Sequence, residues 1–408
     1  MKYLRLPSYW DHGWINLGSV FVTQAFVLGL SGCYSAFIGP IMLDFETTST
    51  IATLGYTAYF IGLVVFSPFV YLMISKKGIK NTILFGLIIL ALGHFFISRV
   101  NNIYQFMTCY AVAISLGTAM SGIIPSTTLI DSWFSDNRGK ALGISAAGVS
   151  VGSFILPPIT VELVQSFGWR NTFLAFSVFS VVFIIPLVQA VVRDSSKIFE
   201  KSESIIPLVD KPQKSYLDIV RQPVFIILVI SCGMGGLAYT GVLINFISIA
   251  TTKGHQALEG ALLISFLTAG MLIGKIIVGI ASDKLSASAL LIACLLFSGL
   301  SLCFLGYLTG YVLMAIVSLC LGIGSGGYLP LIGIFVGNNY EKLDFAKVMG
   351  IVIPGVFIIT SMGPPLVSIL YENSSSYFFV LSTLSLLQTS VAVVLVLLLY
   401  VGKIVMLR

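Results

Sequence analysis

The chain has 408 residues, of which 57% are hydrophobic and 9% are charged, and its net charge is +6. Because soluble domains carry about 25% charged residues, this composition excludes an ordinary soluble protein. It predicts an all-α membrane protein. The six cysteines fall in apolar segments without a CxxC pair, which excludes a disulfide framework or a cysteine-based metal site.

The apolar stretches predict twelve membrane-spanning helices, because a span needs about 20 mostly apolar residues. The longest polar connection is 193–222. It divides the chain into a predicted six-helix bundle (1–192), a cytoplasmic linker (193–222) and a second six-helix bundle (223–408). The predicted spans are 15–37, 51–74, 82–98, 103–130, 140–162, 171–192, 223–250, 258–282, 287–308, 311–336, 347–370 and 377–401.

The distribution of Lys and Arg predicts the orientation of these spans. With the N-terminus inside, 18 of the 22 basic residues lie on the inner side, three lie outside and Lys275 lies within the membrane. Positive residues favour the cytoplasmic side, so both termini and the linker are expected in the cytoplasm. The net positive charge is then explained by the membrane topology, and we expect no nucleic-acid partner.

The two halves repeat with a constant offset of 207 residues. Pro157-Pro158 correspond to Pro364-Pro365, and Gly148 corresponds to Gly355. Parallel repeats of six helices predict a pseudo-two-fold axis along the membrane normal, with a binding site between the halves near the midplane.

Lys275 is the principal candidate for a binding residue. It lies in an apolar helix, eight residues before Asp283. A lysine inside the bilayer costs about 2.5–3.5 kcal/mol on insertion scales, and such residues are usually functional. A structural charge and a lysine that snorkels to the interface are the alternatives. Snorkelling is disfavoured because helical side chains tilt toward the helix N-terminus, which here means toward the membrane centre.

Other polar residues of the spans are weaker candidates for substrate contact. Tyrosine and asparagine also join helices or lie in the interfacial belt, and this structural interpretation stays open for each of them. Gly270 and Gly274 predict a close approach between helices. The further substrate-binding candidates are Gln24, Tyr34, Tyr239, Asn245 and Tyr328.

The two six-helix repeats and the linker resemble the major facilitator superfamily. That family has a loop signature G-x-L-A-D-R-x-G-R-K between helices 2 and 3. Here Ser75 stands at the acidic position, whereas the matching loop of the second half keeps Asp283 and Lys284. The resemblance implies that helices 1, 4, 7 and 10 line the cavity. We expect Asp131, Arg138, Asp283 and Lys284 to belong to a cytoplasmic gate.

Two segments are similar to monocarboxylate porters and oxalate–formate antiporters. They are Asp11–Trp14 at the start of helix 1 and Trp133–Gly148, with Pro157-Pro158 following. The resemblance implies that the substrate carboxylate pairs with a basic residue of helix 8, four positions before a glycine, where Lys275 precedes Gly279. Met271 stands where many relatives carry an acidic or polar residue. Helix 11 lacks the second lysine of oxalate–formate exchangers, which favours a singly charged anion.

The sequence therefore predicts a secondary transporter of a small organic anion, most readily a monocarboxylate, that works by alternating access. Protons or a counter-transported anion are the expected coupling partners, and the lipid bilayer of the plasma (inner) membrane is the expected location. We expect a monomer with no enzymatic activity, no cofactor and no metal. The alternatives are a transporter of a neutral or cationic solute and a membrane sensor that transports nothing.

Overall fold

The computed structural model describes residues 10–134, 137–194, 216–340 and 345–400. Within these ranges the chain forms helices and no strand, so the predicted all-α fold is confirmed. The helices of the first half are α1 (Trp10–Val27), η1 (Gly29–Tyr34), α2 (Ser35–Asp44), α3 (Ser49–Lys77), α4 (Ile79–Ile97), α5 (Ile103–Cys109), η2 (Tyr110–Ile114), α6 (Ser115–Ser121), α7 (Ile123–Trp133), α8 (Arg138–Phe179), η3 (Ser180–Ile184) and α9 (Ile185–Val191).

The helices of the second half begin with a short segment at the end of the linker. They are α11 (Tyr216–Val220), α12 (Pro223–Thr252), α13 (Ala257–Ala281), α14 (Ala287–Tyr307), α15 (Tyr311–Gly326), α16 (Tyr328–Asn339), α17 (Phe345–Ser361), α18 (Gly363–Ser374) and α19 (Tyr377–Tyr400).

Eleven continuous helical stretches in the described ranges are long and apolar enough to cross a membrane. The longest, Gly139–Val191, has 53 residues. At about 1.5 Å per residue it is more than twice as long as a bilayer core is thick. Gly168 interrupts it with φ +79° and ψ 160°, a backbone conformation that glycine adopts at little cost. The stretch therefore contains two spans. The twelve predicted spans match the helical stretches, and the largest difference is in the first, which is predicted at 15–37 and observed at His12–Asp44.

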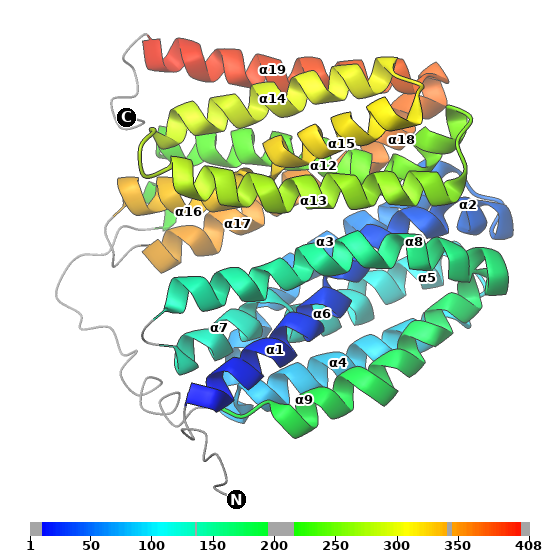
Figure 1. Cartoon of the computed structure of the whole chain (residues 1–408), viewed down its shortest axis with the longest axis vertical. Coiled ribbons are helices and arrows are strands. Elements are labelled where there is room, and N and C mark those ends of the chain that lie inside the picture. Colours follow the sequence, from blue (N-terminus) through cyan, green and yellow to red (C-terminus); the bar gives the residue numbers. More distant parts are fainter. Residues whose placement is uncertain (1–9, 135–136, 195–215, 341–344, 401–408) are drawn as a thin grey trace, which may run out of the picture. The chain divides into compact units, whose positions relative to one another are not determined.

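The chain separates into two compact units (Figure 1). The first contains Met1–Ile41 and Ala58–Leu208, and the second contains Met42–Thr57 and Val209–Arg408. Helix α3 is thus shared, because its first turns pack with the second unit and the rest packs with the first. The predicted bundle boundaries at 192 and 223 stay a prediction, since residues 195–215 lie outside the described ranges.

In the first unit, α1 packs closely along α8. A Cβ on Gly148 or Gly152 would overlap the backbone of α1 at Phe21 and Ala25. Glycine lets helix backbones approach each other, which is how helices associate in a lipid environment. These two glycines therefore set the spacing between α1 and α8.

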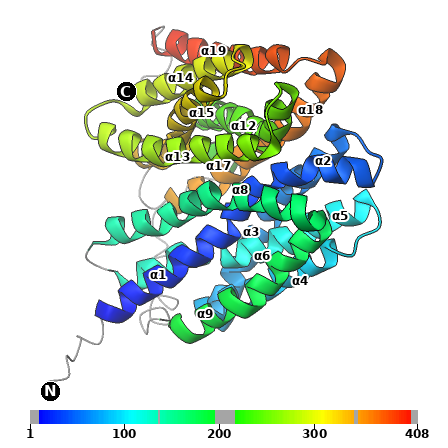
Figure 2. The same ribbon diagram turned by 45° about the vertical axis from the view of Figure 1, so that its right-hand side comes forward.

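In the second unit, α12 is the central helix and contacts α13, α17, α18 and α19 (Figure 2). Its residues Phe225, Leu228 and Cys232 join a core built with α14, α16, α17 and α19. The predicted close approach of α13 is confirmed. A Cβ on Gly270 or Gly274 would overlap the backbone of α15.

Candidate functional site

Lys275 lies on α13, six residues before the helix ends at Ala281. The exposed apolar side chains of this helix lie about 100–200° around its axis from Lys275, at about 100° per residue. They form the face expected to contact lipid, and Lys275 lies on the other side of the helix. The exposed residues are Leu262, Phe266, Ile273, Ile276, Ile277 and Ile280.

The rotation of α13 is fixed by its glycine contact with α15. Gly270 and Gly274 face the backbone of Leu319 and Ile323, and in return Gly322 and Gly326 face Leu267 and Met271. Because the backbones touch at four points, α13 cannot turn about its axis without steric overlap. This contact holds Lys275 away from the lipid-facing side.

The beginning of α13 is also fixed, by a capping box. The Gln256 side chain accepts from the backbone of residue 259, and the Glu259 carboxylate accepts from the Gln256 backbone N–H at 2.9 Å. Such a reciprocal cap satisfies two N–H groups that the first turn leaves without partners. The helix therefore starts at a defined residue, eighteen positions before Lys275.

Lys275 is half-buried, and no described residue forms a hydrogen bond or an ion pair with its ammonium. Buried charges are usually paired. The role of Lys275 in substrate binding stays a prediction.

Asn245 is fully buried in α12, and all its polar atoms are engaged inside the second unit. Its Nδ2 donates to the carbonyl oxygens of Gly241 at 2.9 Å and Pro364 at 3.2 Å. Its Oδ1 accepts from Ser368 Oγ at 3.1 Å. These bonds join α12 to α18, which supports the structural interpretation of Asn245 over substrate contact.

Tyr328 is buried and takes part in a polar network among α14, α16 and α19. Its hydroxyl lies 2.6 Å from Ser298 Oγ and accepts from Gln388 Nε2 at 3.4 Å. Ser298 Oγ also donates to Gln388 Oε1 at 3.3 Å. The network satisfies three polar side chains in an apolar core, so the hydroxyl of Tyr328 is already used by the fold.

Two candidates of the first unit are buried in helix contacts. Gln24 donates through Nε2 to Ser145 Oγ at 3.0 Å, which joins α1 to α8. Tyr34 is 1% exposed and meets Tyr110 edge-on, with ring centroids 5.0 Å apart. The fifth candidate, Tyr239 of α12, is half-buried. Among the described residues of the second unit, no hydrogen bond joins Tyr239, Asn245 or Tyr328 to Lys275.

The predicted gate residues lie at helix ends. Asp131 is half-buried in the last turn of α7, and Arg138 starts α8, with its side chain outside the described residues. Asp283 and Lys284 are exposed in the turn after α13. The expectation that these four residues belong to a cytoplasmic gate therefore stays a prediction.

The sequence interpretation missed a cluster at the end of the first unit, where the linker begins. Asp194 Oδ1 accepts from the backbone N–H of Lys80 at 2.9 Å, at the N-terminus of α4. Burial raises the pKa of the Asp194 carboxyl, although backbone hydrogen bonds from Lys80 and Ile79 and the Lys80 charge oppose the rise. Asp194 thus places an acidic group beside the loop in which Ser75 replaces the expected acid.

Arg193 extends this cluster through its backbone. Its N–H donates to Asn16 Oδ1 at 3.0 Å, and its carbonyl accepts from Trp133 Nε1 at 2.9 Å. Helices α1, α4 and α7 are therefore all tied to the segment that enters the linker. The partners lie 60 to 177 residues apart in the sequence, and this separation hid the cluster from motif analysis.

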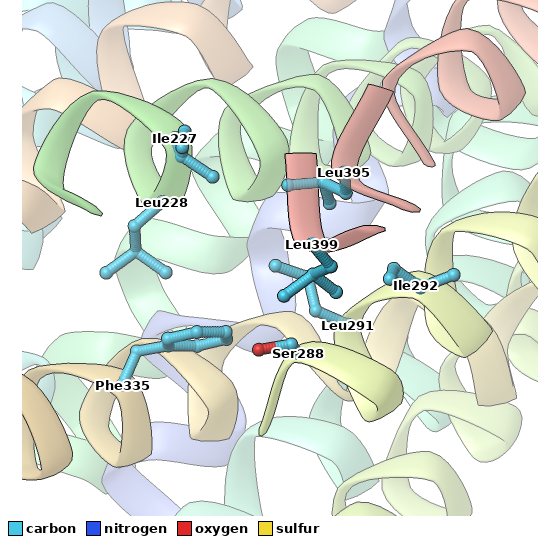
Figure 3. Close-up of a pocket in the computed structure, with 8 residues that line it drawn as sticks. All are labelled: Ile227, Leu228, Ser288, Leu291, Ile292, Phe335, Leu395 and Leu399. Atoms are coloured by element: carbon cyan, nitrogen blue, oxygen red, sulfur yellow. The ribbon is translucent and has the colours of Figure 1, made fainter. Parts of the chain in front are cut away.

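The second unit also holds a small apolar cavity of about 10 Å³ between α12, α14, α16 and α19 (Figure 3). Its walls are Ile227, Leu228, Ser288, Leu291, Ile292, Phe335, Leu395 and Leu399. A cavity of this size holds at most one water molecule. It is a packing defect and not a site for an organic anion.

Comparison with known proteins gives matches along the chain. The model of the Major Facilitator Superfamily matches residues 20–287 and 236–404. The bacterial homologue of the human lysosomal transporter Spinster, solved in an inward-facing and occupied conformation, superposes with a TM-score of 0.72 at 13% identity and covers 96% of each chain. This similarity concerns the fold alone.

Several curated transporters are similar in sequence. The agnestins efflux protein AgnL12 of Paecilomyces divaricatus is 24% identical over 86% of this chain and 77% of its own. Monocarboxylate transporter 12 of Xenopus laevis is 25% identical over 71% of this chain and 67% of its own. The sialic acid transporter NanX of Escherichia coli is 25% identical over 71% of both chains.

Proposed function

The chain belongs to the major facilitator superfamily, and we propose that it is a secondary transporter of a small organic anion, most readily a monocarboxylate. It is a multi-pass integral membrane protein. We further propose that it works in the plasma (inner) membrane as a monomer, with both termini in the cytoplasm.

The half-buried cation Lys275 is the observation that carries this proposal. It lies on the side of α13 away from the exposed isoleucines, and no described side chain neutralises it. A carboxylate would supply the missing counter-charge and accept hydrogen bonds from the ammonium. The similarity to a monocarboxylate transporter and a sialic acid transporter, whose names specify carboxylates, supports an anionic substrate.

The chemistry of lysine shapes the proposed mechanism. An ammonium is a compact point charge that tolerates varied carboxylate orientations. The planar guanidinium of arginine instead favours one orientation, with two parallel hydrogen bonds to the carboxylate. One cation suits one carboxylate, so a singly charged anion is the preferred substrate. Met271 offers no titratable group one turn before Lys275. Transport of the anion is therefore coupled either to the exchange of a second anion or to the loss of a proton from Lys275 itself.

Uptake by proteoliposomes tests the proposal. The panel contains radiolabelled lactate, pyruvate and formate, the dicarboxylates oxalate and succinate, and glucose and choline as neutral and cationic solutes. Each is measured with and without an inward proton gradient, and with internal anion for exchange. The proposal expects saturable uptake confined to the monocarboxylates. Saturable uptake of glucose or choline alone would contradict the proposal and indicate a transporter of a neutral or cationic solute.

A further inference from the structure

Helices α14 and α19 lie side by side in the second unit (Figure 1), and they pack tightly over the second half of α14. A Cβ on Gly299 would lie 3.0 Å from Thr389 Cγ2, and Ser385 Oγ donates to the Gly299 carbonyl at 2.6 Å. Nearer the end of α14, a Cβ on Gly306 would meet Leu381 Cβ at 3.4 Å. This half of the helix pair is therefore closed to a ligand.

An open groove of about 490 Å³ lies between the same helices at their other ends, where α14 begins and α19 ends. On the side of α14 it is lined by Ser286, Ser288, Ala289 and Ile292. On the side of α19 it is lined by Val396, Leu399 and Tyr400. Ligand sites in proteins have volumes of about 300–1,000 Å³, so this α14–α19 groove is large enough for part of an organic molecule.

The α14–α19 groove opens onto the surface that is expected to contact lipid. Leu296, one turn after Ile292 on α14, is exposed, and so is Val393, one turn before Val396 on α19. Residues three or four apart lie on the same face of a helix, so each wall of the groove continues into exposed apolar side chains. Both helices are long and apolar enough to cross a membrane. The medium at the mouth of the groove is therefore hydrocarbon, and the occupant that it supplies is an acyl chain.

Two apolar side chains of the groove have empty space behind them. Ile292 and Leu399 line both the groove and the enclosed cavity of about 10 Å³ (Figure 3). Protein interiors are otherwise close-packed, so a side chain that is pushed inward usually causes strain. Here an acyl chain in the groove presses Ile292 and Leu399 toward the cavity. The groove can therefore deepen at little cost when it is occupied.

The end of the groove at the start of α14 is polar. Ser286 Oγ accepts from the backbone N–H of Ala289 at 3.3 Å as the N-cap of α14, which leaves its own proton for an outside acceptor. Tyr400 is exposed on the other wall, and tyrosine is common at the level of the lipid headgroups. The N-terminus of the 21-residue helix also carries the positive end of its dipole. An apolar groove with one polar end matches a lipid, which has an apolar chain and a polar headgroup.

The sequence next to this polar end is basic. Lys284 is exposed in the turn before α14, next to an exposed Asp283. Beyond Tyr400 the sequence contains Lys403 and Arg408 and no acidic residue. Three basic residues therefore accompany one acidic residue, and basic residues next to a membrane span attract anionic lipids. This charge balance favours an anionic headgroup over a zwitterionic one.

We propose that the α14–α19 groove binds an anionic phospholipid, with one acyl chain between the two helices and the phosphate beside Ser286. The chain fills the space that the side chains of α14 and α19 leave open, and the phosphate accepts from the Ser286 hydroxyl. By the expected topology, the lipid comes from the cytoplasmic leaflet. This site involves the second unit alone and does not depend on the proposed transport function.

Native mass spectrometry of the full-length protein in detergent tests the proposal, through the dissociation constant of the first bound dioleoyl phosphatidylglycerol. Ala289→Phe places a ring in the groove and is expected to weaken lipid binding about tenfold. The matched control is Ala293→Phe, because Ala293 is exposed one turn further along the same helix and does not line the groove. It should bind the lipid as the wild type does. Equal dissociation constants for the two variants would overturn the groove as the binding site.

The headgroup is tested on the wild-type protein, so this measurement does not depend on the folding of a variant. Phosphatidylcholine with the same dioleoyl chains should bind about fivefold more weakly than phosphatidylglycerol. Inorganic phosphate should displace neither lipid, since it has no acyl chain. Equal affinity for the two lipids, or displacement by phosphate, would overturn the assignment of an anionic phospholipid. No transport is measured, so these outcomes are independent of the substrate panel.

Discussion

Gly274 of α13 lies against the carbonyl of Ile323 on α15, so closely that a Cβ at position 274 would overlap it. The neighbouring residue is Lys275, and the orientation of its side chain follows from this contact. The position of the candidate binding charge therefore depends on the absence of a side chain one residue earlier.

The first prediction concerns this contact. Gly274→Ala inserts a methyl group between two packed backbones and is expected to destabilise the protein by about 1–3 kcal/mol, as overpacking does. Thermal unfolding in detergent measures the effect. The control is Gly279→Ala on the same helix, where an added Cβ meets nothing within 4 Å. That variant is expected to be neutral or slightly stabilising, since alanine favours a helix more than glycine does. Equal melting temperatures for the two variants would contradict the packing account.

The second prediction separates a structural tyrosine from a substrate ligand. Tyr328→Phe removes a hydroxyl that bonds to both Ser298 and Gln388, and should cost about 1–3 kcal/mol of stability because the buried Nε2 of Gln388 loses its acceptor. The KM for the transported anion should stay the same. Tyr307→Phe, at a position 78% exposed, is the control and should change neither quantity. A raised KM with unchanged stability would instead place Tyr328 in the binding site.

The third prediction concerns pH. Lys253, just after α12, donates through Nζ to the carbonyls of Gly306 at 2.9 Å and Leu308 at 2.6 Å, at the end of α14. Burial lowers the pKa of this lysine from 10.5 to about 8. Between these values the unfolded chain binds more protons than the folded one, so this residue makes stability rise with pH.

Lys253→Met should abolish that rise. The measurement is the melting temperature of wild type minus that of the variant, followed from pH 7 to pH 10.5, and the difference should increase above pH 8. A flat difference for Lys253→Met would show that burial does not perturb this amine.

The fold was predictable from the sequence because hydropathy and the distribution of basic residues report directly on spans. The close approach at Gly270 and Gly274 was also predictable, since small residues four apart mark such contacts. The roles of Asn245 and Tyr328 were not. Helices that are apolar on every side give no sign of which face turns inward, and the partners Ser368 and Gln388 lie far away in the sequence.

The start of the linker shows the same limit. A motif comparison finds Ser75 where an acid is expected, but it cannot find Asp194. Asp194 contacts the N-terminus of α4 at Lys80, although the two residues are 114 positions apart in the sequence. Pro364 and Pro365 predict two carbonyls without helical donors. The side chains that donate to them, Thr240 and Thr57, are identified by the three-dimensional structure alone.

Uptake by the Lys275→Gln protein tests the central claim most directly. Lys275→Gln and Lys275→Arg are reconstituted beside Arg221→Gln, which removes an exposed cation just before α12. With a monocarboxylate identified by the panel, Lys275→Gln should lower kcat/KM by about 100-fold, near 2.7 kcal/mol. Lys275→Arg should retain part of the activity, and Arg221→Gln most of it. Uptake at the wild-type rate by correctly inserted Lys275→Gln protein would contradict the account.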